Sequence, residues 1–289
     1  MLSVRVIVAG QFVAVAFAAC TSTVNLNNLG SGGGPSSTTD STTASTSESV
    51  TMSSTGVGGA GAGGADTSYR QLVLADGAVA YFRLGDLDTM QAKDEVGGPD
   101  GAYIDATLGT TGAIADDPDT SATFKAVGSR MEIGDRFDFT GTAAFSIEVW
   151  TARDAAIGDS GTLIAKCADI GGYCSGYFMS LSASTGNLRF HRGDGLSLAG
   201  VATPQPAPGT FAHVVATYDG RMLRLYVDGV SADAVSSMTP LVDRPEPLTI
   251  GYWVTWGSYH GSLDEVAIYD MALDPAIIAN HYMVGIGAR

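Results

Sequence analysis

Residues 211–229 read FAHVVATYDGRMLRLYVDG, and this stretch decides the fold. Asp219 and Gly220 form a dipeptide that tolerates the positive φ of both central residues of a type I′ turn, and Asp228 with Gly229 gives a second turn signal. Alternate positions on either side of the first turn are apolar, which gives each strand one apolar face made of Val214, Ala216, Tyr218, Leu223, Leu225 and Val227. The stretch predicts a β-hairpin that belongs to an antiparallel sheet.

Short β-rich segments separated by Gly, Asp and Pro turns continue on both sides of this hairpin. Strands are predicted at residues 79–84, 122–127, 130–133, 145–151, 162–166, 177–182, 188–191, 212–218, 222–227, 248–252 and 263–269. One helix is predicted to start after Asp274 as N-cap, with Pro275 at its first position, and to reach about Met283 with Ile277, Ile278 and Tyr282 toward the sheet. This spacing indicates an all-β sandwich.

Four segments together resemble the laminin-G-like branch of the concanavalin A-like jelly rolls. They are VLADGAVAYFRLGD at 73–86, FSIEVWTARD at 145–154, the hairpin at 211–229, and GSLDEVAIYDMALDPAIIANHY at 261–282. The resemblance covers roughly residues 73–285 and implies a two-sheet antiparallel jelly-roll sandwich with one short C-terminal helix. Since that family mostly binds and seldom catalyses, it also implies a role in binding glycan or protein.

The N-terminal part divides into a signal and a tether. Residues 1–19 have Arg5 as their only charge and a mostly apolar stretch, which predicts a secretory signal peptide. Cys20 after two alanines resembles the lipobox of bacterial lipoproteins, and ordinary secretion after an alanine is the alternative. The lipobox resemblance implies that Cys20 is lipidated, and the Ser, Thr and Gly content of residues 20–68 predicts a disordered tether before a jelly-roll domain at 69–289. The expected location is the cell surface or periplasm, anchored by lipid in the outer membrane.

The cysteine count agrees with an oxidising compartment. If Cys20 carries lipid, Cys167 and Cys174 remain as an even pair, seven positions apart, and a local disulfide is predicted. Two free thiols are the alternative. Two thiols and four scattered histidines offer no zinc-ligand spacing.

The formal net charge of −15 argues against nucleic acid, whose phosphates such a chain repels, and is compatible with calcium. The resemblance implies one structural calcium ion, with Asp94 and Asp264 at positions like those of its ligands in some relatives. Asp86, Asp105 and Asp119 are further candidates. For each residue the alternative is an Asx turn or a solvated loop carboxylate.

No catalytic residue is expected. Related glycoside hydrolases alternate glutamate, aspartate and glutamate along one strand, and here Glu148, Asp264 and Glu265 do not form that pattern. Glu148 and Trp150 also match the pattern of the non-catalytic relatives, so a structural role is predicted for them. A glycoside hydrolase or lyase that uses Glu148 or Glu265 is the alternative function.

The candidate ligand site is the aromatic segment GYWVTWGSYHG at 251–261, because aromatic rings stack on sugar faces and anchor protein interfaces. Its candidate residues are Trp253, Trp256, Tyr259 and His260, and rings that cap the core are the alternative. A second rim is predicted from Tyr173, His191, Arg192 and Asp194. The sequence thus indicates a non-catalytic surface binding or adhesion module, attached to the membrane only through lipid. A structural envelope protein without soluble ligand is a further alternative.

Overall fold

The computed structural model describes residues 68–87, 90–154 and 161–288. The predicted signal peptide, Cys20 and the tether up to residue 67 lie outside the described residues, and so do residues 88–89, 155–160 and 289. In the described part, no helix is long and apolar enough to cross a membrane.

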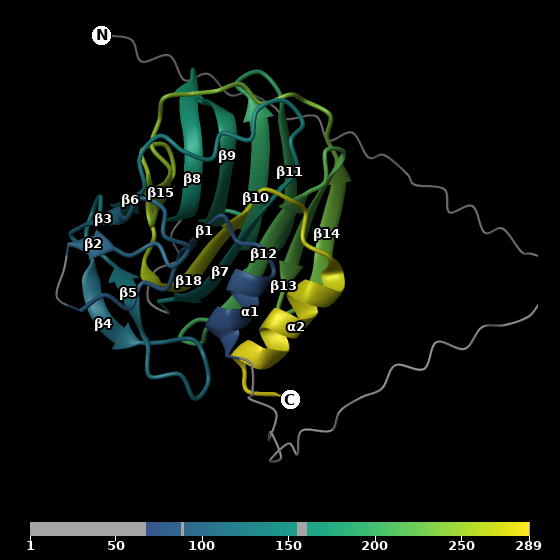
Figure 1. Ribbon diagram of the computed structural model, residues 1–289. Helices are drawn as coiled ribbons and strands as arrows, with labels where there is room; N and C mark the ends of the chain where they lie inside the picture. Colours follow the sequence, from purple (N-terminus) through teal and green to yellow (C-terminus); the bar gives the residue numbers. More distant parts are fainter. Residues whose placement is uncertain (1–67, 88–89, 155–160, 289) are drawn as a thin grey trace, which may run out of the picture. The chain divides into compact units, whose positions relative to one another are not determined.

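Two large antiparallel sheets, here called sheet A and sheet B, face each other across the core (Figure 1). Sheet A contains β1 (Ala80–Phe82), β4 (Thr107–Thr111), β5 (Thr120–Phe124), β7 (Phe145–Arg153), β12 (Ala212–Tyr218), β13 (Met222–Val227), β14 (Val230–Ser236) and β18 (Gly261–Tyr269). Its strand order is β14-β13-β12-β7-β18-β5-β4, with β1 also paired to β18.

Sheet B contains β2 (Gln91–Ala92), β3 (Gly101–Ile104), β6 (Arg130–Glu132), β8 (Gly161–Ile170), β9 (Tyr173–Ser182), β10 (Asn187–Asp194), β11 (Leu198–Pro204) and β15 (Thr249–Ile250). Its order is β11-β10-β9-β8-β15-β6-β3-β2. The predicted two-sheet jelly-roll sandwich is confirmed. A small hairpin of β16 (Tyr252–Trp253) and β17 (Gly257–Ser258) follows β15.

The hairpin at 211–229 forms as predicted, but its turns differ from the prediction. Strands β12 and β13 pair Val214 with Val227 and Tyr218 with Leu223, and the apolar face lies in the core. Gly220 has a φ of 92°, whereas Asp219 keeps a negative φ and its Oδ1 accepts hydrogen bonds from the two following backbone N–H groups of 221 and 222. The prediction of a type I′ turn at this site is therefore wrong, because a longer loop closed by the Asp219 side chain replaces it.

The paired positive φ values occur at the second turn instead. Asp228 has a φ of 51° and Gly229 a φ of 75°, directly between β13 and β14. This is the backbone that a type I′ hairpin requires.

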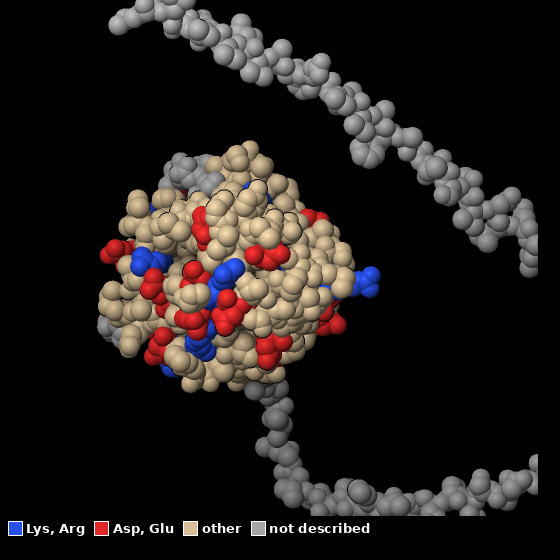
Figure 2. Space-filling model, turned by 90° about the horizontal axis from the view of Figure 1, so that it is seen from above, with Lys and Arg blue, Asp and Glu red and all other residues tan. Residues whose placement is uncertain are grey.

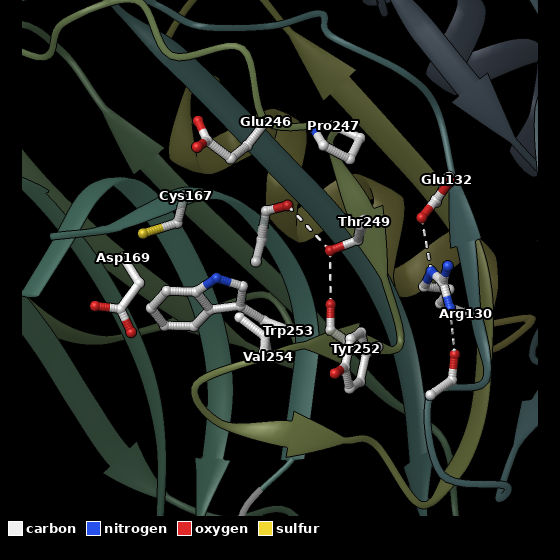
Figure 3. A pocket seen from close by; sticks show the side chains of 12 residues that line it. Arg130, Glu132, Cys167, Asp169, Glu246, Pro247, Thr249, Tyr252, Trp253 and Val254 are labelled. Atoms are coloured by element: carbon white, nitrogen blue, oxygen red, sulfur yellow. Dashed lines mark hydrogen bonds and ion pairs between the residues drawn. The ribbon is translucent and has the colours of Figure 1, made fainter. Parts of the chain in front are cut away.

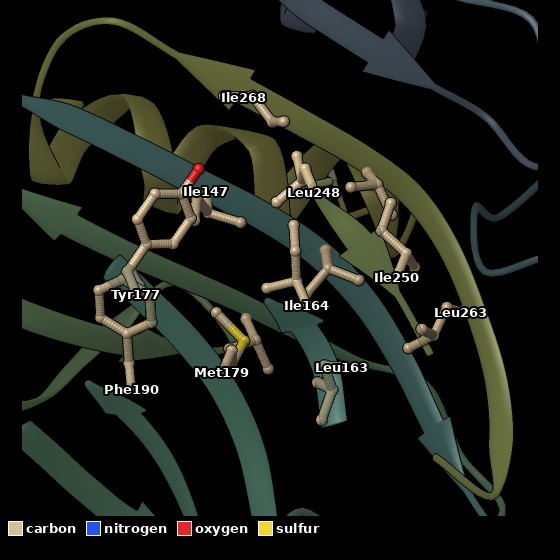
Figure 4. Packing of buried hydrophobic residues seen from close by; sticks show 14 of the residues in the cluster. Ile147, Leu163, Ile164, Tyr177, Met179, Phe190, Leu248, Ile250, Leu263 and Ile268 are labelled. Atoms are coloured by element: carbon tan, nitrogen blue, oxygen red, sulfur yellow. The ribbon is translucent and has the colours of Figure 1, made fainter. Parts of the chain in front are cut away.

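The main core lies between the two sheets and is made of alternate residues from their facing surfaces (Figure 4). Sheet A contributes Ile147, Leu263 and Ile268, and sheet B contributes Ile164, Tyr177, Met179, Phe190 and Ile250. The remaining positions of these strands therefore point outward, and they decide what each outer face can do.

Two helices cover the outer face of sheet A (Figure 1). Helix α2 (Pro275–Gly285) starts as predicted, because the Asp274 side chain accepts a hydrogen bond of 2.8 Å from the N–H of Ala276. Helix α1 (Tyr69–Ala75) was not predicted, although Ser68 and Gln71 form a capping box at its start. Both helices pack on a second apolar cluster that includes Trp150 and Tyr269.

The outer face of sheet B is covered differently. The β16–β17 hairpin lies against it, and Trp253 and Trp256 cluster there with Phe178. Cys167 and Cys174 form the predicted disulfide beneath, with a Cα–Cα distance of 5.6 Å. Elsewhere on the surface, acidic side chains are spread over the face seen in Figure 2, and most basic side chains lie next to acidic ones.

Candidate functional site

A cavity of about 470 Å³ opens on the outer face of sheet B, in the size range of small-molecule sites (Figure 3). It is lined from β6, β8, β15, β16 and the segment before β15. The charged and aromatic side chains among its lining are Arg130, Glu132, Asp169, Glu246, Tyr252 and Trp253.

Strand alternation places these side chains. In β6, Met131 is buried in the core, so Arg130 and Glu132 point outward on either side of it. In β8, the outward positions that line the cavity are Ala165, Cys167 and Asp169. The polar wall of the cavity thus follows from the same period of two that builds the core.

The aromatic part of the site is mostly packed rather than open. Trp253 is 7% exposed and its ring lies 5.0 Å from that of Phe178. Trp256 lies 5.9 Å from the same ring, and the guanidinium of Arg189 stacks on Trp256 at 4.5 Å. Two nitrogens of Arg189, Nε and Nη2, are buried without a hydrogen-bond partner. These aromatic rings are therefore largely packed against other residues at the edge of the cavity and do not form a flat exposed surface.

Asp169 fixes the rim of the cavity by joining two hairpins. Its Oδ2 accepts a hydrogen bond of 2.6 Å from the hydroxyl of Thr255, and its Oδ1 accepts one of 2.6 Å from the N–H of Gly172. These hydrogen bonds, that from Thr255 first, hold the pKa of the Asp169 carboxyl below its usual value. The tip of the β8–β9 hairpin is thereby tied to the β16–β17 hairpin.

The other charged side chains of the lining include an arginine that is already paired and a glutamate that has no partner among the described residues. Arg130 donates 2.7 Å to Glu132 Oε1 and 2.8 Å to the carbonyl of Gly128, and its guanidinium lies 5.8 Å from the centre of the Tyr252 ring. Glu246 Oε2 is buried and has no hydrogen-bond partner. Figure 3 shows Glu246 on the side of the cavity across from Arg130.

The predicted aromatic residues separate in the structure. Trp253 lines the cavity, and Trp256 lies half-buried next to it. Tyr259 needs correction as a ligand residue: it is fully buried in the core between the sheets, where its hydroxyl lies 2.6 Å from the Thr151 hydroxyl. His260 is half-buried outside the lining, and its carbonyl accepts from the N–H of Asp154.

The predicted second rim does not form one surface. Arg192 is fully buried beneath the sheet and bonds to the Thr239 carbonyl at 2.7 Å, so it needs correction as a rim residue. His191 stacks on Phe178 at 5.0 Å, and burial lowers its pKa to about 4. Tyr173 is exposed, and Asp194 caps the β10–β11 turn by accepting backbone N–H bonds.

The polar residues of the cavity were missed by the sequence reading. Arg130, Glu132 and Glu246 come from segments that β15 brings together by pairing with β6 on one side and β8 on the other. Outward-facing charges in otherwise apolar strands were the available signal, but a solvated sheet face gives the same pattern.

Glu148 is fully buried under the two helices of sheet A, as the structural interpretation predicted. Its carboxylate accepts hydrogen bonds of 2.7 Å from Tyr69, Tyr269 and His213 Nε2, and of 3.0 Å from His281 Nδ1. Burial alone would raise the pKa of Glu148, but the charge of His281 and the two histidine hydrogen bonds hold it well below its usual value. This glutamate is a link between sheet and helices.

His281 completes that link on its other side. Its Nε2 lies 2.9 Å from Asp76 Oδ2, at the end of α1, so the imidazole bridges α1, α2 and β7. Burial would lower its pKa, yet Glu148 and Asp76 raise it to about 9.

Glu265 and Asp264 are also buried, at 1% exposure each. Glu265 forms an ion pair of 2.8 Å with Arg83 and accepts a hydrogen bond from Tyr81. Burial raises the pKa of Glu265 to about 7, although the charge of Arg83 lowers it. Both Asp264 oxygens accept backbone N–H bonds, from Ala113 and from Glu265 itself. Burial, with the charge of Glu265, raises the pKa of Asp264 well above its usual value.

The donor sets at Asp94 and Asp264 fit a shared calcium ion poorly. Asp94 Oδ1 accepts from two backbone N–H groups, and its buried Oδ2 has no hydrogen-bond partner and lies 3.9 Å from Arg136. Asp264, in contrast, already uses both oxygens, and its raised pKa favours the neutral form, which is a weak calcium ligand. Calcium at these residues stays a prediction.

A different acidic cluster gathers within the described residues. Carboxylate oxygens of Asp135, Asp138 and Asp243 lie within 4.8 Å of one another. The buried ammonium of Lys166 lies among them, 2.5 Å from Asp135 and 3.0 Å from Asp138, and donates 2.6 Å bonds to the carbonyls of Arg244 and Glu246. A cation from the chain itself therefore already compensates part of the charge of this cluster.

Solved structures with the same fold include proteins that act on or bind sialic acid. They include a sialidase from Trypanosoma rangeli (15% identity, TM-score 0.56), the same enzyme in complex with sialic acid (16%, 0.55), and the ligand binding domain of botulinum neurotoxin serotype D in complex with N-acetylneuraminic acid (12%, 0.56). These matches cover 72%, 72% and 73% of this chain, but only 33%, 34% and 52% of those chains. At such identities the likeness shows the fold alone.

A comparison with curated proteins gives no match. The family model named Laminin_G_3 and described as the concanavalin A-like lectin/glucanases superfamily matches residues 103–279, more than half of the chain. The chain belongs to this family.

Proposed function

We propose that this domain binds carbohydrate through the cavity on the outer face of sheet B. The observation that carries the proposal is the cavity itself, about 470 Å³ in volume, in which Tyr252 and Trp253 meet carboxylates and a guanidinium. Sugars need this combination of ring faces or edges with polar groups that hydrogen-bond their hydroxyls. The fold family and the sialic acid complexes of the sialidase and the neurotoxin domain support a glycan in general.

We propose also that the domain binds without catalysis. The two carboxylates that a hydrolase of this superfamily would use, Glu148 and Glu265, are 0% and 1% exposed. Each is held by several hydrogen bonds or an ion pair within the fold. A soluble polysaccharide has no path to either group in this arrangement, which supports a binding role over a hydrolytic one.

Display at the cell surface is part of the same proposal. It rests on the sequence of the first 68 residues, with lipid at Cys20 and a Ser/Thr/Gly tether, and these residues lie outside the described part except Ser68. The cavity would then face partners outside the cell at the end of a flexible linker.

The test is a glycan-array screen of the purified full chain, followed by titration of the hits with two matched tyrosine variants. Tyr252→Ala removes a ring that lines the cavity, whereas Tyr173→Ala removes an exposed ring outside the lining. We expect Tyr252→Ala to weaken binding by about tenfold, from the loss of an aromatic contact, and Tyr173→Ala to leave it unchanged.

Three results would count against the proposal. Loss of binding only in Tyr173→Ala would move the site to the tip of the β8–β9 hairpin. A folded chain that binds no glycan on the array would point to a protein partner or a structural role. Hydrolysis of any polysaccharide by the wild-type chain, absent in Glu148→Gln or Glu265→Gln, would establish the catalytic alternative.

A further inference from the structure

We infer that the cavity selects a sugar that carries a free amino group, such as a glucosamine unit, over a sugar acid. This inference rests on the proposed carbohydrate site and names its ligand class. It departs from the sialic acid bound in the sialidase and neurotoxin structures.

The charges of the cavity wall are unbalanced. Three carboxylates line it, from Glu132, Asp169 and Glu246, against the single guanidinium of Arg130. Arg130 is already paired with Glu132 at 2.7 Å, so its charge is compensated within the wall. Neither Asp169 nor Glu246 makes an ion pair with any described residue, so two negative charges face the cavity uncompensated. A carboxylated sugar would enter this field against repulsion.

Glu246 is the group that most needs a donor. Its Oε2 is buried and accepts no hydrogen bond from any described residue, and because the carboxylate lines the cavity, a cation bound against it would compensate its charge. An ammonium group brings three N–H donors and a positive charge, which makes it the best complement to a carboxylate.

The backbone that carries Glu246 is held in place from the other side of the sheet. Lys166 donates 2.6 Å hydrogen bonds to the carbonyls of Arg244 and Glu246, the residues before Pro247 and β15. The Glu246 side chain therefore lines the cavity from a fixed segment, with its carboxylate on the side of Cys167 (Figure 3). Lys166 is a positioning residue for this site.

Asp169 supplies the second negative charge from the rim. Its oxygens already accept from Thr255 and Gly172, so it shapes the opening and contributes charge rather than a free acceptor. Its exposed position makes its effect sensitive to salt, unlike that of Glu246. Together, the carboxylates of Asp169 and Glu246 favour a cation bound next to Glu246.

The test compares matched ligands that differ at one group. Calorimetric titrations of the full chain would use glucosamine oligomers, N-acetylglucosamine oligomers of the same length, and N-acetylneuraminic acid. Acetylation keeps the sugar ring and removes the charge. We expect the free amine to bind about tenfold more tightly than the acetylated sugar, since a charged hydrogen bond is gained. We expect no measurable binding of the acid.

Glu246→Gln is the decisive variant, with Glu132→Gln on the other side of the same cavity as its matched control. Because the Glu246 carboxylate has no partner to lose, we expect the melting temperature to stay unchanged, and the preference for the free amine to disappear. Glu132→Gln should keep the preference. Equal binding of amine and acetylated sugar by the wild-type chain, or tighter binding of the acid, would overturn the inference and leave carbohydrate binding intact. Binding of no sugar at all would overturn both.

Discussion

The outer faces of the two sheets both carry carboxylates and aromatic rings, but sheet A encloses its carboxylate whereas sheet B leaves one beside a cavity. On sheet A, α1 and α2 cover Glu148, and its carboxylate is surrounded by Tyr69, Tyr269, His213 and His281. On sheet B, the short β16–β17 hairpin lies against the strands, and Glu246, which lines an open cavity, has a carboxylate oxygen without a hydrogen-bond partner among the described residues.

The difference shows how a glutamate can be assigned a role from its surroundings. A buried carboxylate that receives four donors stabilises the fold and leaves nothing for a ligand. A carboxylate that lines a cavity with an unused oxygen adds little to stability and remains able to bind. If this contrast is right, removing the carboxylate on the covered face should lower stability more than removing one on the open face.

The largest effect is expected from Glu148→Gln on the covered face. The change leaves the His281 imidazolium buried without its carboxylate, which should lower the free energy of unfolding by about 3 to 5 kcal/mol. Urea denaturation followed by circular dichroism measures this loss. The matched change on the open face is Glu132→Gln, which breaks a partly exposed pair with Arg130 and should cost less than about 1 kcal/mol. Similar losses in both variants would remove the distinction between the two faces.

The pH dependence of stability should report on the same covered network. The pKa of His281 is raised to about 9 in the fold from an ordinary 6.5, so its stabilisation is complete below pH 6.5 and is lost as pH rises through 9. We expect the free energy of unfolding to fall by about 3 kcal/mol over this range. His281→Asn should lack the slope, whatever its stability at pH 6.

Glu265 gives a second prediction for the pH dependence of stability, at lower pH than His281. Its pKa is raised to about 7, so the fold binds a proton more tightly than the unfolded chain and loses stability as pH rises from about 4.5 to 7. Compared with the wild type, Glu265→Gln should therefore lose this fall below pH 7 and keep the slope above it, while His191, whose pKa is lowered to about 4, adds stability to both chains as pH rises to 6.5. A wild-type profile without a fall between pH 7 and 9 would contradict the charged state of His281.

The fold could be predicted largely because its signals are local. Strands β12 and β13 have the predicted bounds, and Asp274 caps α2 where the sequence placed it. Helix α1 escaped notice because seven residues are too few to show helical periodicity, and its capping box at Ser68 was the remaining signal. The turn at Asp219 differs from the predicted type I′ turn because an Asp side chain can close a longer loop as well as a two-residue turn.

The candidate site could be predicted only in its aromatic part. Trp253 was found because rings between two strands are visible in a sequence, but Tyr259 in the same segment turns into the core. Glu246 and Arg130 lie more than one hundred positions apart and meet only through the pairing of β15 with its neighbours. Whether a charge on a strand meets a partner or a cavity depends on such long-range contacts.

A further effect, smaller than those on the covered face, is expected from calcium near Lys166, which lies behind the open face. Its ammonium contacts two carboxylates and two carbonyls, the oxygen ligands that calcium prefers. Lys166→Met removes the cation and leaves the carboxylates of Asp135, Asp138 and Asp243 close together. We expect this variant to be destabilised and then partly rescued by calcium, by about 1.4 kcal/mol when calcium reaches ten times its dissociation constant.

The wild-type chain should show a smaller calcium effect, because Lys166 already supplies the charge. Thermal melts with calcium and with chelator measure the difference, and Asp94→Asn separates the other predicted calcium residue. A different result is that calcium stabilises the wild type and Lys166→Met equally, and that Asp94→Asn abolishes this stabilisation. This result would place the ion at Asp94 and refute a site at the lysine. If calcium rescues only Lys166→Met, the lysine occupies the position of a metal ion, and through its bond to the Glu246 carbonyl that same cation holds the wall of the sugar site in place.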